Sequence, residues 1–129
     1  MVRAWYPPRV RTAADRLRYY AQHFDTVEVD STYYGIPTPA TARAWAERTP
    51  PEFTFHMKAF AMLTRHGVRP EQVPAALRTR HELELDSRGR ILHPSRALRE
   101  ETFALFVDAL EPLRAQDKLG LILMQFPPY

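Results

Sequence analysis

The sequence of 129 residues contains no cysteine and only four glycines, and lysine occurs only at positions 58 and 118. The absence of cysteine excludes a disulfide framework and thiolate chemistry. No apolar run approaches the roughly 18 residues that span a bilayer, and the first residues lack the apolar core of a secretory signal. We therefore expect a cytoplasmic protein without a membrane segment.

Several functional motifs that depend on glycine are also missing. Neither G-x-G-x-x-G nor a P-loop pattern occurs, and there is no G-x-S-x-G nucleophile elbow. These absences exclude the common nucleotide-binding and serine-hydrolase motifs.

The positive charge is carried almost entirely by arginine, and the formal net charge is +3. The stretch from residue 65 to residue 99 holds eight arginines, but it also holds the acids Glu71, Glu82, Glu84 and Asp86. A phosphate-binding surface clusters basic residues without matched acids. We therefore keep two interpretations of this stretch, a solvated loop of mixed charge and a phosphate-binding patch.

The length and composition are those of one soluble globular domain, with 45% hydrophobic and 26% charged residues. Three segments predict β-strands, at residues 27–30, 53–58 and 119–125. The first two alternate between apolar and polar residues. The third is a nearly continuous apolar run, which is typical of a strand buried on both faces of a sheet.

Two helix starts are indicated by capping residues. Thr12 is followed three residues later by Asp15, which predicts a capping box. Thr38 and Pro39 form a second start signal, with proline in the first helical position, and residues 49–51 end that helix.

A third helix is predicted from about residue 100 to residue 115, with a kink or break at Pro112. Between the second strand and this helix lies a long connection at about 61–95, for which we expect a helical turn or two within 70–78 and a tip at 86–90. Because helices and strands alternate, the sequence predicts an α/β fold with a parallel sheet.

Polar residues collect at the carboxyl ends of the predicted strands, where sites form in parallel α/β folds. If the sheet curls toward a barrel, one interior mouth is lined by Glu28, Asp30, His56, Lys58 and Gln125. Buried carboxylates are costly unless they are paired or used, so Glu28 and Lys58 form either a structural ion pair or part of a reactive site. His56 is either a hydrogen-bonded core histidine or a ligand contact. Trp45, Tyr33 and Tyr34 either pack or wall a pocket.

The same region contains side chains of the types that bind metals, namely Glu28, Asp30, His56 and His66. No local spacing such as His-x-x-x-His joins them. We therefore predict no metal site, and the sequence identifies no cofactor.

Several motifs, in order along almost the whole chain, resemble the signature of the YecE-like family (domain of unknown function 72). They are residues 27–34 (VEVDSTYY) followed by Pro37, Trp45 and Thr49-Pro50; residues 53–60 (FTFHMKAF); Leu63-Thr64 with His66; and Lys118-Leu119-Gly120 leading to residues 125–128 (QFPP). The resemblance implies a TIM-type β/α barrel without an established activity. The family residues that it carries over are Glu28, Asp30, Ser31, Thr32, Tyr34, Lys58, His66 and Gln125. Many members have asparagine where this chain has Asp30, and glycine is common where Arg65 stands.

The resemblance also implies that residues 1–129 form a single partial barrel domain, about strands two to four, with the long loop at about 61–95. Family members usually open with a strand that carries a Gly-Thr-Ser/Cys-Gly/Ser-Trp motif, which this sequence lacks. A TIM barrel takes about 250 residues, so a piece of this size leaves two open sheet edges. Self-association through those edges is one expectation.

From these residues we expect a small anionic or phosphoester-type ligand that is bound or transformed at the strand ends. Lys58 would act as electrophile or anion clamp, Glu28 or Asp30 as acid or base, and His66 as a partner from a loop. The remaining ligand contacts would be Ser31, Thr32, Tyr34, His56 and Gln125. Whether the chain is an enzyme stays open. The alternatives are a nucleic-acid-binding or repair-like barrel and an inactive truncated interaction module.

Overall fold

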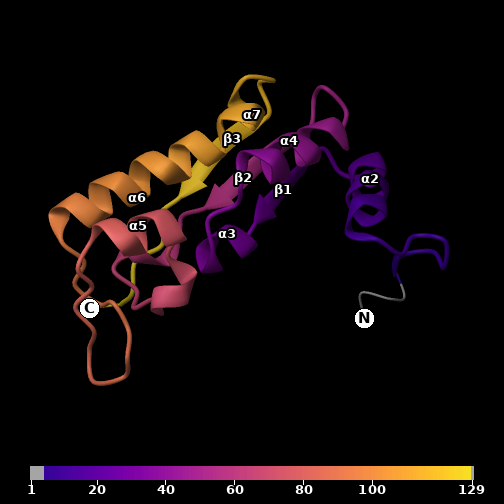
Figure 1. The fold of residues 1–129 in the computed structure, drawn as a ribbon. Helices are drawn as coiled ribbons and strands as arrows, with labels where there is room; N and C mark the ends of the chain where they lie inside the picture. The colour runs from indigo at the N-terminus through magenta and orange to yellow at the C-terminus, as the bar shows by residue number, and fades with distance from the viewer. Residues whose placement is uncertain (1–4, 129) are drawn as a thin grey trace.

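The computed structural model describes residues 5–128. It shows a small parallel sheet with helices packed against it (Figure 1). The strands are β1 (Thr26–Val29), β2 (Thr54–Lys58) and β3 (Leu119–Leu123), in the spatial order β1-β2-β3. Both neighbouring pairs are parallel. The predicted α/β fold with parallel strands is confirmed.

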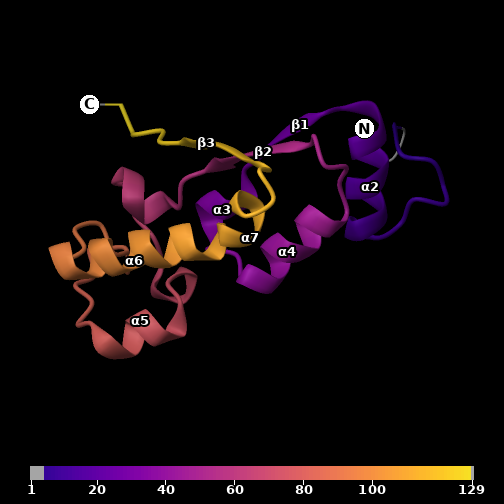
Figure 2. The ribbon, with the colours of Figure 1, turned by 90° about the horizontal axis from the view of Figure 1, so that it is seen from above.

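The helices lie mostly on one side of the strands. They are α2 (Ala13–His23), α3 (Ser31–Tyr34), α4 (Pro39–Glu47), α5 (Ala75–Arg80), α6 (Arg96–Ala109) and α7 (Glu111–Arg114), with the short 3-10 helices η1 (Ala61–Thr64) and η2 (Pro70–Gln72). Figure 2 shows α3, α4, α6 and α7 all on the same side of the sheet. No helix within residues 5–128 has the length and apolar character that crossing a bilayer requires.

Two of the helices begin where their capping residues predict. Thr12 Oγ1 accepts a hydrogen bond from the backbone N–H of Asp15 at 3.0 Å, and the Asp15 carboxylate accepts from the Thr12 N–H at 3.3 Å. Thr38 Oγ1 accepts from the N–H of Thr41 at 3.2 Å, and α4 begins at Pro39. These bonds satisfy N–H groups that have no partner inside the helix, and both predicted starts are confirmed.

The third predicted helix is divided in two. α6 begins at Arg96, where Ser95 Oγ accepts from the N–H of Leu98 at 3.1 Å, so the predicted start near residue 100 was wrong. α6 ends at Ala109, and Pro112 lies in the first turn of α7. The predicted break at Pro112 is confirmed, because proline has no N–H to continue the bonding of the preceding helix.

The core lies between the sheet and the helices. Its largest fully buried side chains include Phe53, Phe55, Met57, Phe106 and Leu113. Trp45 of α4 stacks on Phe55, with ring centroids 6.2 Å apart, so the packing role for this tryptophan is confirmed. Each fully buried side chain of this size contributes about 1.5–3 kcal/mol through the hydrophobic effect.

The long connection between β2 and α6 is folded onto this core. It contains η1, η2 and α5, which confirms the helical turns predicted within 70–78. Val68 and Ile91 form an isolated antiparallel bridge, and both side chains are buried. The connection is therefore held at both ends by apolar contacts.

One face of the sheet is open in the part of the chain that the structure describes. In β3, Leu119 and Ile122 pack against the core, whereas Leu121 and Leu123 are 71% and 42% exposed. The expectation that β3 is buried on both faces is therefore wrong for residues 5–128. β1 and β3 also each have a neighbour on one side only, which leaves two open edges.

Candidate ligand site at the carboxyl ends of β1 and β2

The polar side chains of β1 and β2 share the open face of the sheet. Glu28 is the register partner of His56, and Lys58 follows His56 by two residues, so strand alternation places the three on the same face. Their neighbours in sequence, such as Val29 and Met57, pack into the core. Glu28 is exposed, while His56 and Lys58 are half-buried.

Lys58 is held by an aromatic ring. Its Nζ lies 4.9 Å from the ring centroid of Tyr33, which is a cation–π contact. Tyr33 belongs to α3, directly after β1, and makes edge-to-face contacts with Tyr34 and with His66, whose ring centroid is 5.2 Å away. Burial, followed by the neighbouring Tyr34, raises the pKa of the Tyr33 hydroxyl. Sequence reasoning treated Tyr33 only as packing or a pocket wall and missed this contact.

The ion pair between Glu28 and Lys58, one of the two roles considered for these residues, is not formed. Within residues 5–128, Glu28, Asp30 and Lys58 take part in no ion pair. Both carboxylates are exposed to solvent, so neither carries the cost of an unpaired buried charge. The contact that the structure gives the Lys58 ammonium is the Tyr33 ring.

Thr32 uses its hydroxyl inside the protein. The side chain is buried, and Oγ1 lies 2.6 Å from the carbonyl oxygen of Lys58 and 3.1 Å from that of Val29. It therefore ties the start of α3 to the backbone at the end of β2. Ser31 and Tyr34, its neighbours on α3, are exposed. Ligand contact by these three residues stays a prediction.

His66 is carried by the turn after η1. Its Nδ1 lies 2.9 Å from Thr64 Oγ1, which in turn donates to the carbonyl oxygen of Ala61 at 3.2 Å. With that donation in place, the hydroxyl accepts from His66 Nδ1–H. Arg65, between them, has a φ of 65°, in the left-handed region that glycine favours. This conformation accounts for the glycine that the resemblance places at this position.

The two remaining predicted residues, Asp30 and Gln125, follow the carboxyl ends of β1 and β3. Asp30 directly precedes α3, and its side chain makes no capping hydrogen bond. Gln125 follows β3 by two residues and is exposed, and among residues 5–128 no hydrogen bond joins it to Lys58 or Glu28. In the same part of the chain, no three histidine, aspartate or glutamate side chains are grouped to hold a metal ion.

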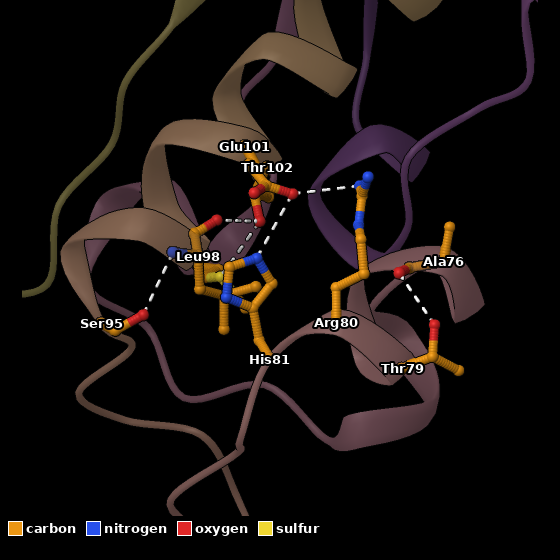
Figure 3. A network of polar contacts seen from close by, with 9 residues as sticks. Ala76, Thr79, Arg80, His81, Ser95, Leu98, Glu101 and Thr102 are labelled. Atoms are coloured by element: carbon orange, nitrogen blue, oxygen red, sulfur yellow. Dashed lines mark hydrogen bonds and ion pairs between the residues drawn. The ribbon is translucent and has the colours of Figure 1, made fainter.

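Several arginines of the long connection and the start of α6 are paired with acids. Arg80 contacts Glu101 at 3.0 Å, and His81 lies 3.3 Å from the same carboxylate (Figure 3). Arg90 contacts Asp86 at 3.0 Å in a similar way. This pairing favours the interpretation of residues 65–99 as a surface of mixed charge.

The fold and the site define a class: an α/β protein with a parallel sheet that presents polar side chains on one face and packs its helices on the other. Residues 1–129 match the model of the family described as "Protein of unknown function DUF72". The chain belongs to this family.

Two UPF0759 proteins are similar to this chain in sequence. The UPF0759 protein YunF of Bacillus subtilis (strain 168) is 31% identical over 124 residues, which are 96% of this chain and 36% of YunF. The UPF0759 protein YecE of Escherichia coli (strain K12) is 38% identical over 62 residues, or 48% of this chain and 23% of YecE. The chain thus spans about a third or less of the length of these relatives.

A solved structure supports the fold. The crystal structure of a DUF72 family protein (EF0366) from Enterococcus faecalis V583 matches with a TM-score of 0.62 and 27% sequence identity, over 88% of this chain and 36% of that chain. The matched region therefore covers most of the described elements.

Proposed function

We propose that this chain is a single partial domain of a TIM-type β/α barrel that binds or transforms a small anionic or phosphoester-type ligand at the carboxyl ends of β1 and β2. The barrel is supported by the parallel strands, by the helices on one face and by the polar row on the other. In a closed barrel that polar row would face the interior.

The ligand proposal rests mainly on the surroundings of the Lys58 ammonium group. Its ammonium rests on the Tyr33 ring, and it has no carboxylate partner within residues 5–128. A half-buried cation without a counter-charge attracts an anion more strongly than an exposed cation does, because solvent screens it less. Lys58 is thus the proposed anion clamp, with Glu28 or Asp30 as acid or base and His66 as the partner from the loop.

The test is the substitution Lys58→Ala, with binding of inorganic phosphate followed by NMR shifts of the backbone amides around Lys58 and His66. A hydrogen bond to a charged group contributes about 1.5–3 kcal/mol, so phosphate affinity should fall about tenfold or more. The melting temperature should change little, because Lys58 makes no ion pair within residues 5–128, and a cation–π contact such as that with Tyr33 contributes only about 0.5–1 kcal/mol.

Arg43→Ala is the matched control, since Arg43 is an exposed cation on α4 and lies on the helical side of the sheet. It should leave phosphate affinity unchanged. Equal losses in the two variants would show a general effect of net charge and contradict the proposal. A fall in melting temperature without a change in binding would show that Lys58 is a structural residue.

The nucleic-acid alternative has no comparable observation in its favour, because at least four of the eight arginines between residues 65 and 99 are paired with acids in the structure, namely Arg69, Arg80, Arg90 and Arg96. Binding of DNA or RNA that weakens steeply with salt would support it.

A further inference from the structure

An irregularity in β3 lies opposite His56. β2 and β3 pair Phe55 with Leu119 and then Met57 with Ile122, so β3 has one residue more than β2 between these pairs. Such a bulge takes backbone groups out of the regular ladder. Gly120 and Leu121 are the two residues that face His56 across it.

Gly120 leaves room for the imidazole ring. A Cβ added at this position would collide with Cε1 and Nδ1 of His56 and would lie 2.8 Å from Cγ2 of Thr54. Because real Cβ atoms do not approach other atoms so closely, any larger residue would displace the ring. The glycine therefore allows the His56 ring to approach the backbone of β3 closely.

The next residue fixes the tautomer of the ring. The backbone N–H of Leu121 donates to Nδ1 of His56 at 2.9 Å, which gives this N–H a partner in place of the sheet ladder. A nitrogen that accepts a hydrogen bond carries no proton, so the neutral ring must hold its proton on Nε2. Within residues 5–128, Nε2 has no hydrogen-bond partner and is not among the buried atoms that lack one, so solvent reaches it.

We propose that His56, positioned by Gly120 and by the Leu121 N–H, is a hydrogen-bond donor to an acceptor oxygen of the ligand, and that the site selects a small anion that also carries hydroxyl groups. This inference rests on the proposed function. The open face offers a cation at Lys58 and a donor at His56 Nε2, and the carboxylate of Glu28 is the register neighbour of His56. An unpaired carboxylate repels a bare anion, but it accepts hydrogen bonds from hydroxyl groups. A phosphate monoester of a polyol combines both features.

The first experiment measures the tautomer without any ligand. Long-range ¹H–¹⁵N NMR of the histidine rings at neutral pH should show His56 with a protonated Nε2 and an unprotonated Nδ1. A protonated Nδ1, or averaging between the two tautomers, would overturn the positioning by Leu121.

The second experiment compares His56→Asn with His56→Gln. The asparagine oxygen can stand where Nδ1 stands and accept from Leu121, but the distal donor is lost. The glutamine amide places a donor near the position of Nε2 but leaves Leu121 unpaired. The probe is glycerol 3-phosphate, with inorganic phosphate as the ligand that lacks hydroxyl groups.

We expect the unsubstituted chain to bind glycerol 3-phosphate more tightly than phosphate. The affinity for glycerol 3-phosphate should fall about tenfold in His56→Asn, and it should fall less in His56→Gln. Unchanged binding in His56→Asn, or equal affinity of the unsubstituted chain for the two probes, would overturn this inference alone. If the unsubstituted chain binds neither probe, the proposed function and the ligand class are both wrong. The NMR measurement of the tautomer would still test whether the Leu121 N–H positions His56.

Discussion

Lys118 is the one buried cation among residues 5–128, and its ammonium binds the chain after α4 rather than a ligand. Its side chain is 3% exposed, and Nζ donates to the carbonyl oxygens of Ala46 and Thr49 at 2.6 and 2.7 Å and to Thr49 Oγ1 at 3.1 Å. Ala46 lies in the last turn of α4, and its carbonyl oxygen also accepts from the Thr49 N–H at 3.4 Å and from Thr49 Oγ1 at 3.2 Å. Thr49 follows the helix, and its carbonyl oxygen accepts from Lys118. Burial lowers the pKa of the Lys118 ammonium, and the charge of Glu52 partly opposes this.

Replacing Lys118 by methionine should destabilise the fold by about 1–3 kcal/mol, because the buried carbonyl oxygen of Thr49 loses its donor. Urea unfolding of both proteins measures the difference. Arg114→Met is the matched control, since Arg114 pairs with Glu111 on the surface, where ion pairs contribute about 0–1 kcal/mol. Equal losses in the two variants would contradict the structural role of Lys118.

The residues of the candidate site were predictable where strand alternation alone decides their position. Glu28, His56 and Lys58 share a face because they have the same parity along two strands in register. The contact of Lys58 with Tyr33 was not predictable, since it depends on α3, a helix of four residues without a side-chain capping bond. The hydrogen bond from Thr32 to Lys58 likewise joins residues 26 positions apart, and no local pattern encodes such a contact.

At the scale of the elements, the tip of the long connection shows how a local signal becomes a fixed structure. The Asp86 carboxylate accepts from the backbone N–H groups of Arg88 and Arg90, each at 2.9 Å. It also accepts from the Arg90 guanidinium at 3.0 and 3.1 Å. Gly89 takes a φ of 72°, which this turn requires and other residues rarely adopt. The tip predicted at 86–90 is therefore confirmed.

Asp86 should make the stability of the chain depend on acidic pH. The hydrogen bond from the Arg90 N–H, followed by the Arg88 N–H and the Arg90 side chain, lowers the pKa of the Asp86 carboxyl below its ordinary value of 3.8. A lowered native pKa means that the stabilisation is fully present above about pH 3.8 and is lost as the pH falls through the native value. Asp86→Asn should be less stable than the unsubstituted chain at neutral pH, and this difference should shrink in acid.

Urea midpoints of the two proteins, measured from neutral to strongly acidic pH, test this expectation. Asp108→Asn is the control, since it removes the same charge from an exposed position on α6. A difference between Asp86→Asn and the unsubstituted chain that stays constant across the whole range would show that the Asp86 charge does not contribute.

At the scale of the whole molecule, the sequence predicted the order of the elements but not which surfaces are covered. Alternating helices and strands were enough for a parallel sheet, since parallel strands need crossover connections. The apolar run of β3 predicted burial on both faces, but Leu121 and Leu123 are exposed in residues 5–128. The apolar residues of a strand indicate that its faces favour burial. They do not indicate which segment of the protein packs against each face. The position of the open face could therefore be found only from the assembled sheet.

The open face and edges should make the isolated chain associate with itself. β1 and β3 each present an unpaired edge, and Leu121, Leu123 and Met124 are 71%, 42% and 40% exposed beside the β3 edge. Exposed apolar side chains next to unpaired strand edges favour contact between chains. Sedimentation velocity should accordingly show a weight-average coefficient that rises with protein concentration. Leu121→Glu should suppress this rise, because the new charges repel each other across a shared edge.

Leu85→Glu is the control for this experiment, since Leu85 is 52% exposed and lies on the long connection, away from the sheet. It adds the same charge to the chain but should leave the association unchanged. Both substitutions replace exposed side chains, so neither should alter the urea midpoint appreciably. A chain that remains monomeric at all concentrations would contradict the prediction. Equal suppression by the two variants would show that net charge, rather than the open face of the sheet, controls the association.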